Sequence, residues 1–189
     1  MYRAITLFFL RNHVDWTDPI EVAKALNNIQ VDFQYNPKSE QTEINLNSEN
    51  VEYLIRDIVV AEKVSEVAAI GAVRSFAVRQ QQFMGAKKGI VMDGRDIGTT
   101  VFPDAELKIF MTADIPIRVE RRFKEMYAKN PNITIDEVKA NIELRDNIDS
   151  SREVSPLRKA PDALVLDNTC LSEKEQFDFA LSRALERIG

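Results

Sequence analysis

Short apolar runs alternate with helical segments in the second half of the chain, and this alternation limits the fold more than any other feature. Three runs have the length and composition of strands: Gly89–Met92, Leu107–Met111 and Ala163–Leu166. Helical patterns lie between these runs and after the last of them. Strands that are separated by helices pair in parallel, because each helix crosses over the sheet. We therefore expect an α/β fold in which helices flank a parallel sheet.

Helices and one hairpin are predicted before this region. The first helix spans about Tyr2–Asn12, and a second begins after Asp18, an N-cap residue that is followed by proline. Across Gln30–Leu46 apolar and polar residues alternate on both sides of a turn, which predicts an antiparallel hairpin. Helical spacing returns over Asn50–Met84, with Gly71 as a break, and predicts two or three helices.

Capping motifs mark the later helices. Asp114 precedes a helix with an early proline, and Thr134–Glu137 and Ser172–Glu175 have the spacing of capping boxes. Apolar residues of the last helix recur at i, i+4, i+7, i+8 and i+11, which predicts a stripe that faces the core. The residues of this stripe are Phe177, Leu181, Ala184, Leu185 and Ile188.

The composition argues against several classes of protein. A net charge of −5 disfavours broad binding to nucleic acid, which needs a basic face. No stretch approaches the roughly 20 apolar residues of a membrane span, so we expect a cytoplasmic protein with no membrane partner. The single cysteine, Cys170, can form neither an internal disulfide nor a cysteine zinc site.

The loop after Gly89–Met92 carries the strongest chemical signal. Asp93 follows the apolar run, so we expect it at the carboxyl end of a strand, where open α/β sheets bind ligands. Arg95 suits a phosphate and Asp96 accepts from amino groups, so together they fit a nucleotide. A strand-to-helix turn with a solvated ion pair explains the same spacing. A hydrolase that uses Asp93 and Asp96 as paired carboxylates is a weaker alternative.

A second polar cluster contains Arg145, Asp149 and Arg152. Their spacing of i, i+4 and i+7 places all three on one face of a helix. This pattern is typical of a solvated, salt-bridged helix end. It is also typical of a closing lid that brings arginines to a phosphoryl group and excludes water from it.

Taken in order, these motifs resemble the cytidylate kinases, the bacterial-type branch of the nucleoside monophosphate kinases, over nearly the whole chain. The segments that carry the resemblance are Tyr2-Arg3-Ala4, Ser65 with Arg74, Asp93 to Thr99, Phe102 to Ala105, Arg145-Asp146 with Asp149 and Arg152, Ser155-Pro156-Leu157, and Ala163 to Asp167. The resemblance implies transfer of the γ-phosphoryl group of ATP, with Mg²⁺, to CMP or dCMP. The products are then ADP with CDP or dCDP.

The resemblance also implies a domain organisation. A three-layer core like that of the P-loop kinases would comprise residues 1–26 and 65–189, with a lid at about 130–156. The hairpin would belong to a small insert, residues 27–64, that closes over the monophosphate. The family is usually monomeric.

Site residues follow from the same resemblance. The implied substrate-binding residues are Tyr2, Arg3, Ser65, Arg74, Arg95, Asp96, Arg145, Asp149 and Arg152. The implied catalytic residues among them are Arg95, Arg145 and Arg152. Asp96 with Arg74 and Ser65 suits cytosine, which presents an amino donor and a carbonyl acceptor. Asp167, Asn168 and Thr169 are implied to lie near the adenine of ATP, and Asp93 to act on Mg²⁺ indirectly.

One motif of the family does not occur in the sequence. Such kinases carry G-x-x-x-x-G-K-[ST] after their first strand, and neither Gly-Lys-Ser nor Gly-Lys-Thr is present. We therefore expect an N-terminally truncated chain that lacks the first two strands and the P-loop helix and is a weak or inactive kinase. A non-catalytic CMP-binding fragment is the alternative, as is a chain that completes its sheet with a partner. We expect truncation to promote self-association.

Overall fold

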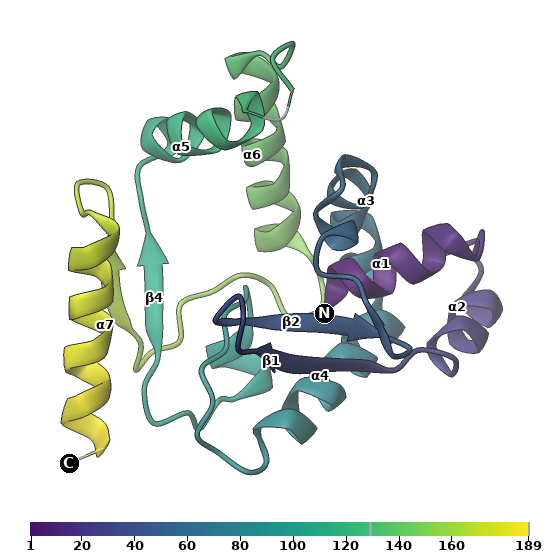
Figure 1. Ribbon diagram of the computed structural model, residues 1–189, viewed down its shortest axis with the longest axis horizontal. Helices are drawn as coiled ribbons and strands as arrows, with labels where there is room; N and C mark the ends of the chain where they lie inside the picture. The colour runs from purple at the N-terminus through teal and green to yellow at the C-terminus, as the bar shows by residue number, and fades with distance from the viewer. Residues whose placement is uncertain (129, 189) are drawn as a thin grey trace. The chain divides into compact units, whose positions relative to one another are not determined.

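The chain forms two compact units in a computed structural model that describes residues 1–128 and 130–188 (Figure 1). The units comprise residues 1–91 and 92–189. This division is based on contacts within the chain. The predicted division into a kinase core and an insert at residues 27–64 stays a prediction.

The first unit contains helices and a small antiparallel sheet. Its elements are α1 (Tyr2–Arg11), α2 (Pro19–Leu26), β1 (Val31–Asn36), β2 (Gln41–Leu46), β3 (Glu49–Asn50), the 3-10 turn η1 (Leu54–Arg56), α3 (Ile58–Ala69) and α4 (Gly71–Gly85). The predicted helices and hairpin are confirmed, and β3 is an addition at the sheet edge. Asp18 caps α2, since its carboxylate accepts from the Ile20 amide at 2.8 Å.

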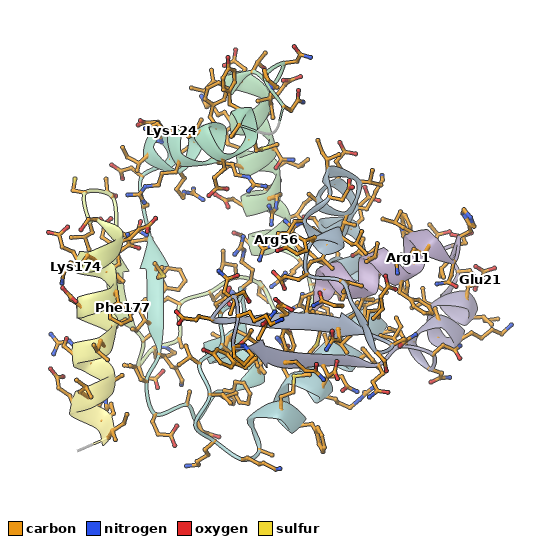
Figure 2. The ribbon with its side chains drawn as sticks, viewed as in Figure 1. Arg11, Glu21, Arg56, Lys124, Lys174 and Phe177 are labelled. Atoms are coloured by element: carbon orange, nitrogen blue, oxygen red, sulfur yellow. The ribbon has the colours of Figure 1, made fainter. Side chains whose placement is uncertain are left out.

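The core of the first unit lies between α1, α3 and the hairpin. Ile5 and Phe9 of α1 are fully buried, as are Val51 and Val67. Arg11 (Figure 2), at the end of α1, is bound to Glu49 of β3 with an N–O distance of 2.6 Å. The hydrogen bond that Arg11 donates to Glu49 raises the pKa of Arg11, although this exposed pair contributes little to stability.

The second unit alternates strands and helices. Its elements are the π-helix η2 (Ile97–Val101), β4 (Ile109–Thr112), α5 (Ile115–Tyr127), α6 (Ile135–Ser151), β5 (Leu164–Asp167) and α7 (Glu173–Ile188). The predicted parallel pairing is confirmed between β4 and β5, in a register that aligns Ile109 with Leu164. Both predicted capping boxes are also present, at Thr134–Glu137 and Ser172–Glu175.

The strand predicted at Gly89–Met92 is wrong, because this segment is not part of any sheet among the described residues. A strand needs a hydrogen-bonded neighbour, and Val91 is instead fully exposed. The described residues form a two-stranded parallel sheet and a three-stranded antiparallel one rather than one large parallel sheet. The α/β class is confirmed, with smaller sheets than expected.

The predicted core-facing stripe of α7 is also wrong. Phe177 (Figure 2) is 63% exposed, and Leu181, Leu185 and Ile188 are exposed as well. The half-buried side of α7 is an adjacent one that carries Phe179. Periodicity alone could not show which of these two neighbouring sides of α7 packs against the unit, because both carry apolar residues.

No helix in the described part of the chain is long and apolar enough to cross a bilayer.

Candidate functional site

Asp149 joins two arginines from segments that lie far apart in the sequence. Its Oδ2 accepts from Arg95 Nε at 2.9 Å, and its Oδ1 accepts from Arg152 Nη1 at 3.1 Å. Arg152 Nε also donates to the Ser155 carbonyl at 2.6 Å. Ser155 has a φ of 52°, a left-handed conformation that is uncommon outside glycine. The structure thus brings the predicted residues Arg95, Asp149 and Arg152 together.

Arg145 adds a further positive charge to this arginine cluster (Arg95, Arg145, Asp149 and Arg152). Burial lowers the pKa of Arg145, and the positive charge of Arg95 lowers it further, while Asp149 acts in the opposite direction. Arg145 Nε is buried and has no hydrogen-bond partner among the residues that the structure describes. A buried donor without a partner is costly, and an oxyanion at this position would supply an acceptor. The cluster has three guanidinium groups and one carboxylate, so it carries a net positive charge.

Asp96 begins a π-helical turn directly after Arg95. Its backbone carbonyl accepts from the amides of Thr100 at 2.9 Å and Val101 at 3.3 Å. Asp96 itself is only 4% exposed. π-helical turns are rare in proteins, and those that do occur are frequently found at functional sites. The sequence did not predict this turn, because its hydrogen bonds are not encoded in a hydrophobic period.

The first unit contains the other residues that were implied to bind the base and the phosphate. Arg74 is 1% exposed, and its guanidinium lies 5.3 Å from the centroid of the Tyr2 ring. Arg74 Nη1 donates to the Ala68 carbonyl at 3.0 Å, and Arg3 Nη1 donates to the Ile55 carbonyl at 3.0 Å. Tyr2 and Arg74 are thus brought together within this unit. Ser65 is half-buried in the middle of α3.

The segment implied to lie near adenine is held by hydrogen bonds from its own unit. Asp167 Oδ1 accepts from the Thr169 hydroxyl at 2.6 Å, which lowers the pKa of Asp167. Arg121 of α5 donates to the Asn168 side chain at 3.1 Å and to the Asn168 carbonyl at 2.8 Å. Sequence reasoning missed Arg121, since its partners are 47 residues away. These bonds keep the segment ordered, and they support a structural role at least as directly as a binding one.

Asp93 is exposed and is not at the end of a strand. No group of three or more histidine, cysteine, aspartate or glutamate side chains among the described residues could hold a metal ion. Mg²⁺ in phosphoryl-transfer sites is usually held by one or two carboxylates together with substrate phosphates. A single exposed carboxylate therefore fits a supporting role toward Mg²⁺ and does not form a metal site by itself.

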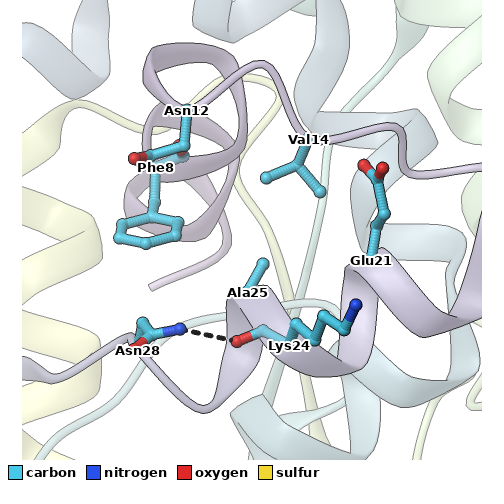
Figure 3. A pocket seen from close by; sticks show the side chains of 7 residues that line it. All are labelled: Phe8, Asn12, Val14, Glu21, Lys24, Ala25 and Asn28. Atoms are coloured by element: carbon cyan, nitrogen blue, oxygen red, sulfur yellow. Dashed lines mark hydrogen bonds between the residues drawn. The ribbon is translucent and has the colours of Figure 1, made fainter.

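A pocket of the first unit does not contain any predicted site residue. It has a volume of about 420 Å³ and lies between α1 and α2 (Figure 3). Asn28 Nδ2 donates to the Lys24 carbonyl, and Asn12 Nδ2 donates to the Phe8 carbonyl, each at 2.8 Å. The amide groups of the pocket thus bind their own helices. None of the arginines of the cluster lines this open surface pocket.

The chain is an α/β protein, and its family match places it in the nucleotide kinase class. The family model described as Cytidylate kinase matches residues 1–185. The chain belongs to the cytidylate kinase family, a family of nucleoside monophosphate kinases. This match does not support the predicted N-terminal truncation, since it begins at residue 1.

Individual relatives agree with the family. A cytidylate kinase of Cytophaga hutchinsonii is 49% identical over 188 residues, which cover 100% of this chain and 80% of that protein. One of Flavobacterium psychrophilum is 52% identical over 184 residues, which cover 96% of this chain and 81% of the relative. A cytidylate kinase of Bacteroides fragilis is 49% identical over 191 residues, which cover 100% of this chain and 83% of that relative.

Proposed function

We propose that this chain binds CMP or dCMP and transfers the γ-phosphoryl group of ATP to it, in the cytoplasm. The observation that carries the proposal is the net positive arginine cluster around Asp149, which includes Arg95 from the same loop as the buried Asp96. A guanidinium cluster suits the acceptor phosphate. A carboxylate suits the amino group of cytosine, which uracil lacks. The family relationship supports the same substrate class.

We assign roles to the residues as follows. Arg95 and Arg152 bind the acceptor phosphate, and Arg145 stabilises the charge that develops as the phosphoryl group moves. Asp149 orients Arg95 and Arg152 and lies near the sugar. Asp96 reads the cytosine edge. By the family resemblance, Ser65 and Arg74 are assigned to the base, and Tyr2 and Arg3 to the monophosphate.

ATP and Mg²⁺ are the cofactors of this proposal. When bound, Mg²⁺ would neutralise charge on the donor phosphates. Asp93 is the carboxylate that would support the ion indirectly. Asp167, Asn168 and Thr169 face adenine in this proposal, on a segment that Arg121 keeps in place.

Calorimetry with CMP and UMP tests the acceptor side. We expect tighter binding of CMP, and we expect Asp96→Asn to remove most of the preference, since an amide presents donors as well as an acceptor. The surface variant Asp178→Asn, in α7, serves as the control. Equal affinities of the unmodified chain for CMP and UMP would contradict the proposal.

We further propose that this chain transfers the phosphoryl group slowly. The sequence contains neither Gly-Lys-Ser nor Gly-Lys-Thr, and a loop with that motif normally cradles the β- and γ-phosphates. This observation also favours a second function, a CMP-binding chain without turnover. An assay of CDP formation from CMP and ATP separates the two: measurable turnover supports the kinase, and CMP binding without turnover supports the non-catalytic binder.

A further inference from the structure

Lys108 is a nearly buried lysine that the proposed reaction does not use. Its side chain is only 7% exposed, although it lies just before β4. Its Nζ donates to both carboxylate oxygens of Asp162, at 2.7 and 3.0 Å, and to the Pro103 carbonyl. Lysine is almost never buried unless its ammonium has such partners. The Lys108 carbonyl accepts from the Leu164 amide at 2.9 Å, so the parallel sheet fixes the backbone from which this side chain extends.

The contacts of Lys108 lead to the π-helix η2. Pro103 lies two residues after η2, and the Phe102 amide before it donates to the Ile97 carbonyl at 2.7 Å. The aliphatic part of Lys108 also covers η2, because a Cβ added at Gly98 would be 3.3 Å from Lys108 Cδ. Lys108 therefore holds η2 at its end and along its side.

The position of η2 determines the position of Asp96 and Arg95. Asp96 is the residue from which η2 begins, and its carbonyl accepts from the amides of Thr100 and Val101. A displacement of η2 would therefore move the Asp96 backbone. A carboxylate that discriminates cytosine from uracil must be correctly placed, because a small misplacement weakens a hydrogen bond steeply.

We infer that Lys108 is a positioning residue that holds η2 and thereby sets the preference of Asp96 for cytosine over uracil. The inference rests on the proposed function and deepens it. Lys108 does not touch the nucleotide in this account, and it acts through Pro103 and Gly98. Asp162 orients the ammonium, and in turn the Lys108 ammonium lowers the pKa of Asp162.

Lys108→Met tests the inference, since methionine keeps an aliphatic stem over Gly98 and removes the ammonium. Calorimetry with CMP and with UMP gives the ratio of the two affinities, well below the unfolding temperature of each variant. We expect the ratio to fall roughly tenfold in Lys108→Met and to recover largely in Lys108→Arg, which keeps the charge and donors. Lys124→Met is the matched control, because Lys124 (Figure 2) is exposed and paired only with Glu120 in the same helix.

A preference for CMP that survives in Lys108→Met would overturn the inference and leave the proposed function intact. An unmodified chain without any preference would overturn both. A loss of thermal stability with an unchanged ratio would show a merely structural role and also count against the inference. If Lys108→Met does not fold, Gly98→Ala replaces it, with Gly71→Ala as control because a Cβ at Gly71 meets no atom within 4 Å. An unchanged ratio in Gly98→Ala would then overturn the inference.

Discussion

At the scale of single residues, the carboxylate of Asp149 binds both Arg95 and Arg152. The Asp149 and Arg152 side chains are mostly buried, so solvent screens their interaction less than that of an exposed pair. Removing one charge from such a group leaves the others without compensation. Asp149 is therefore expected to matter for stability as well as for binding.

Asp149→Asn should lower the free energy of unfolding by about 1–3 kcal/mol, since charged hydrogen bonds are lost and the arginines then repel one another. Urea denaturation measures this change. Asp146→Asn is the matched control, because the 2.7 Å pair of Asp146 with Arg118 is considerably more exposed and should contribute less than about 1 kcal/mol. Equal losses in the two variants would contradict the role of Asp149.

The spacing of Arg145 and Asp149 was sufficient to predict that they share a face of α6, because helical geometry is local, whereas Arg152 is the C-cap residue just beyond the helix. The pair of Arg95 with Asp149 spans 54 residues, and no local pattern encodes it. The same limit applies to Lys108, whose partner Asp162 is also 54 residues away. The resemblance to a family supplied Arg95 but did not supply Lys108.

At the scale of elements, local signals predicted the helix starts and the hairpin turn correctly. Caps depend on a side chain and an amide two or three residues apart, so a sequence shows them directly. The strand at Gly89–Met92 depended on a neighbouring strand, and the face of α7 depended on what packs against it. Neither neighbour is visible in a local pattern, and both predictions were wrong.

The capping box of α6 should make stability depend on pH. The Thr134 amide and hydroxyl bind Glu137 and hold its pKa below the ordinary value. A lowered pKa in the folded state means that the stabilisation is complete above the unfolded pKa of about 4.3 and is lost as pH falls through the lower folded value.

Glu137→Gln should therefore reduce the loss of folding stability that occurs as pH falls. Glutamine keeps an acceptor for the Thr134 amide but does not titrate. Thermal unfolding of both proteins between about pH 2 and pH 7 measures the difference. We expect the unmodified chain to lose more of its melting temperature than the variant below about pH 4.3. Parallel curves would show that this box does not contribute.

At the scale of the whole molecule, ligand binding and stability are linked, because a ligand that binds only the folded chain stabilises it. At 100 times its Kd, CMP should stabilise the chain by roughly 2.7 kcal/mol, and thus raise Tm by roughly 5–10 °C. Scanning fluorimetry measures this shift. The same CMP concentration should shift Asp96→Asn less, and the absence of a shift in the unmodified chain would contradict the proposed acceptor site.

The carboxylate of Asp149 also has a consequence for the thermodynamics of binding. Its two oxygens are held apart by covalent geometry, and each accepts from a different arginine. The carboxylate therefore holds Arg95 and Arg152 around one anionic group before any nucleotide arrives. The side-chain entropy of these arginines is lost during folding rather than during association.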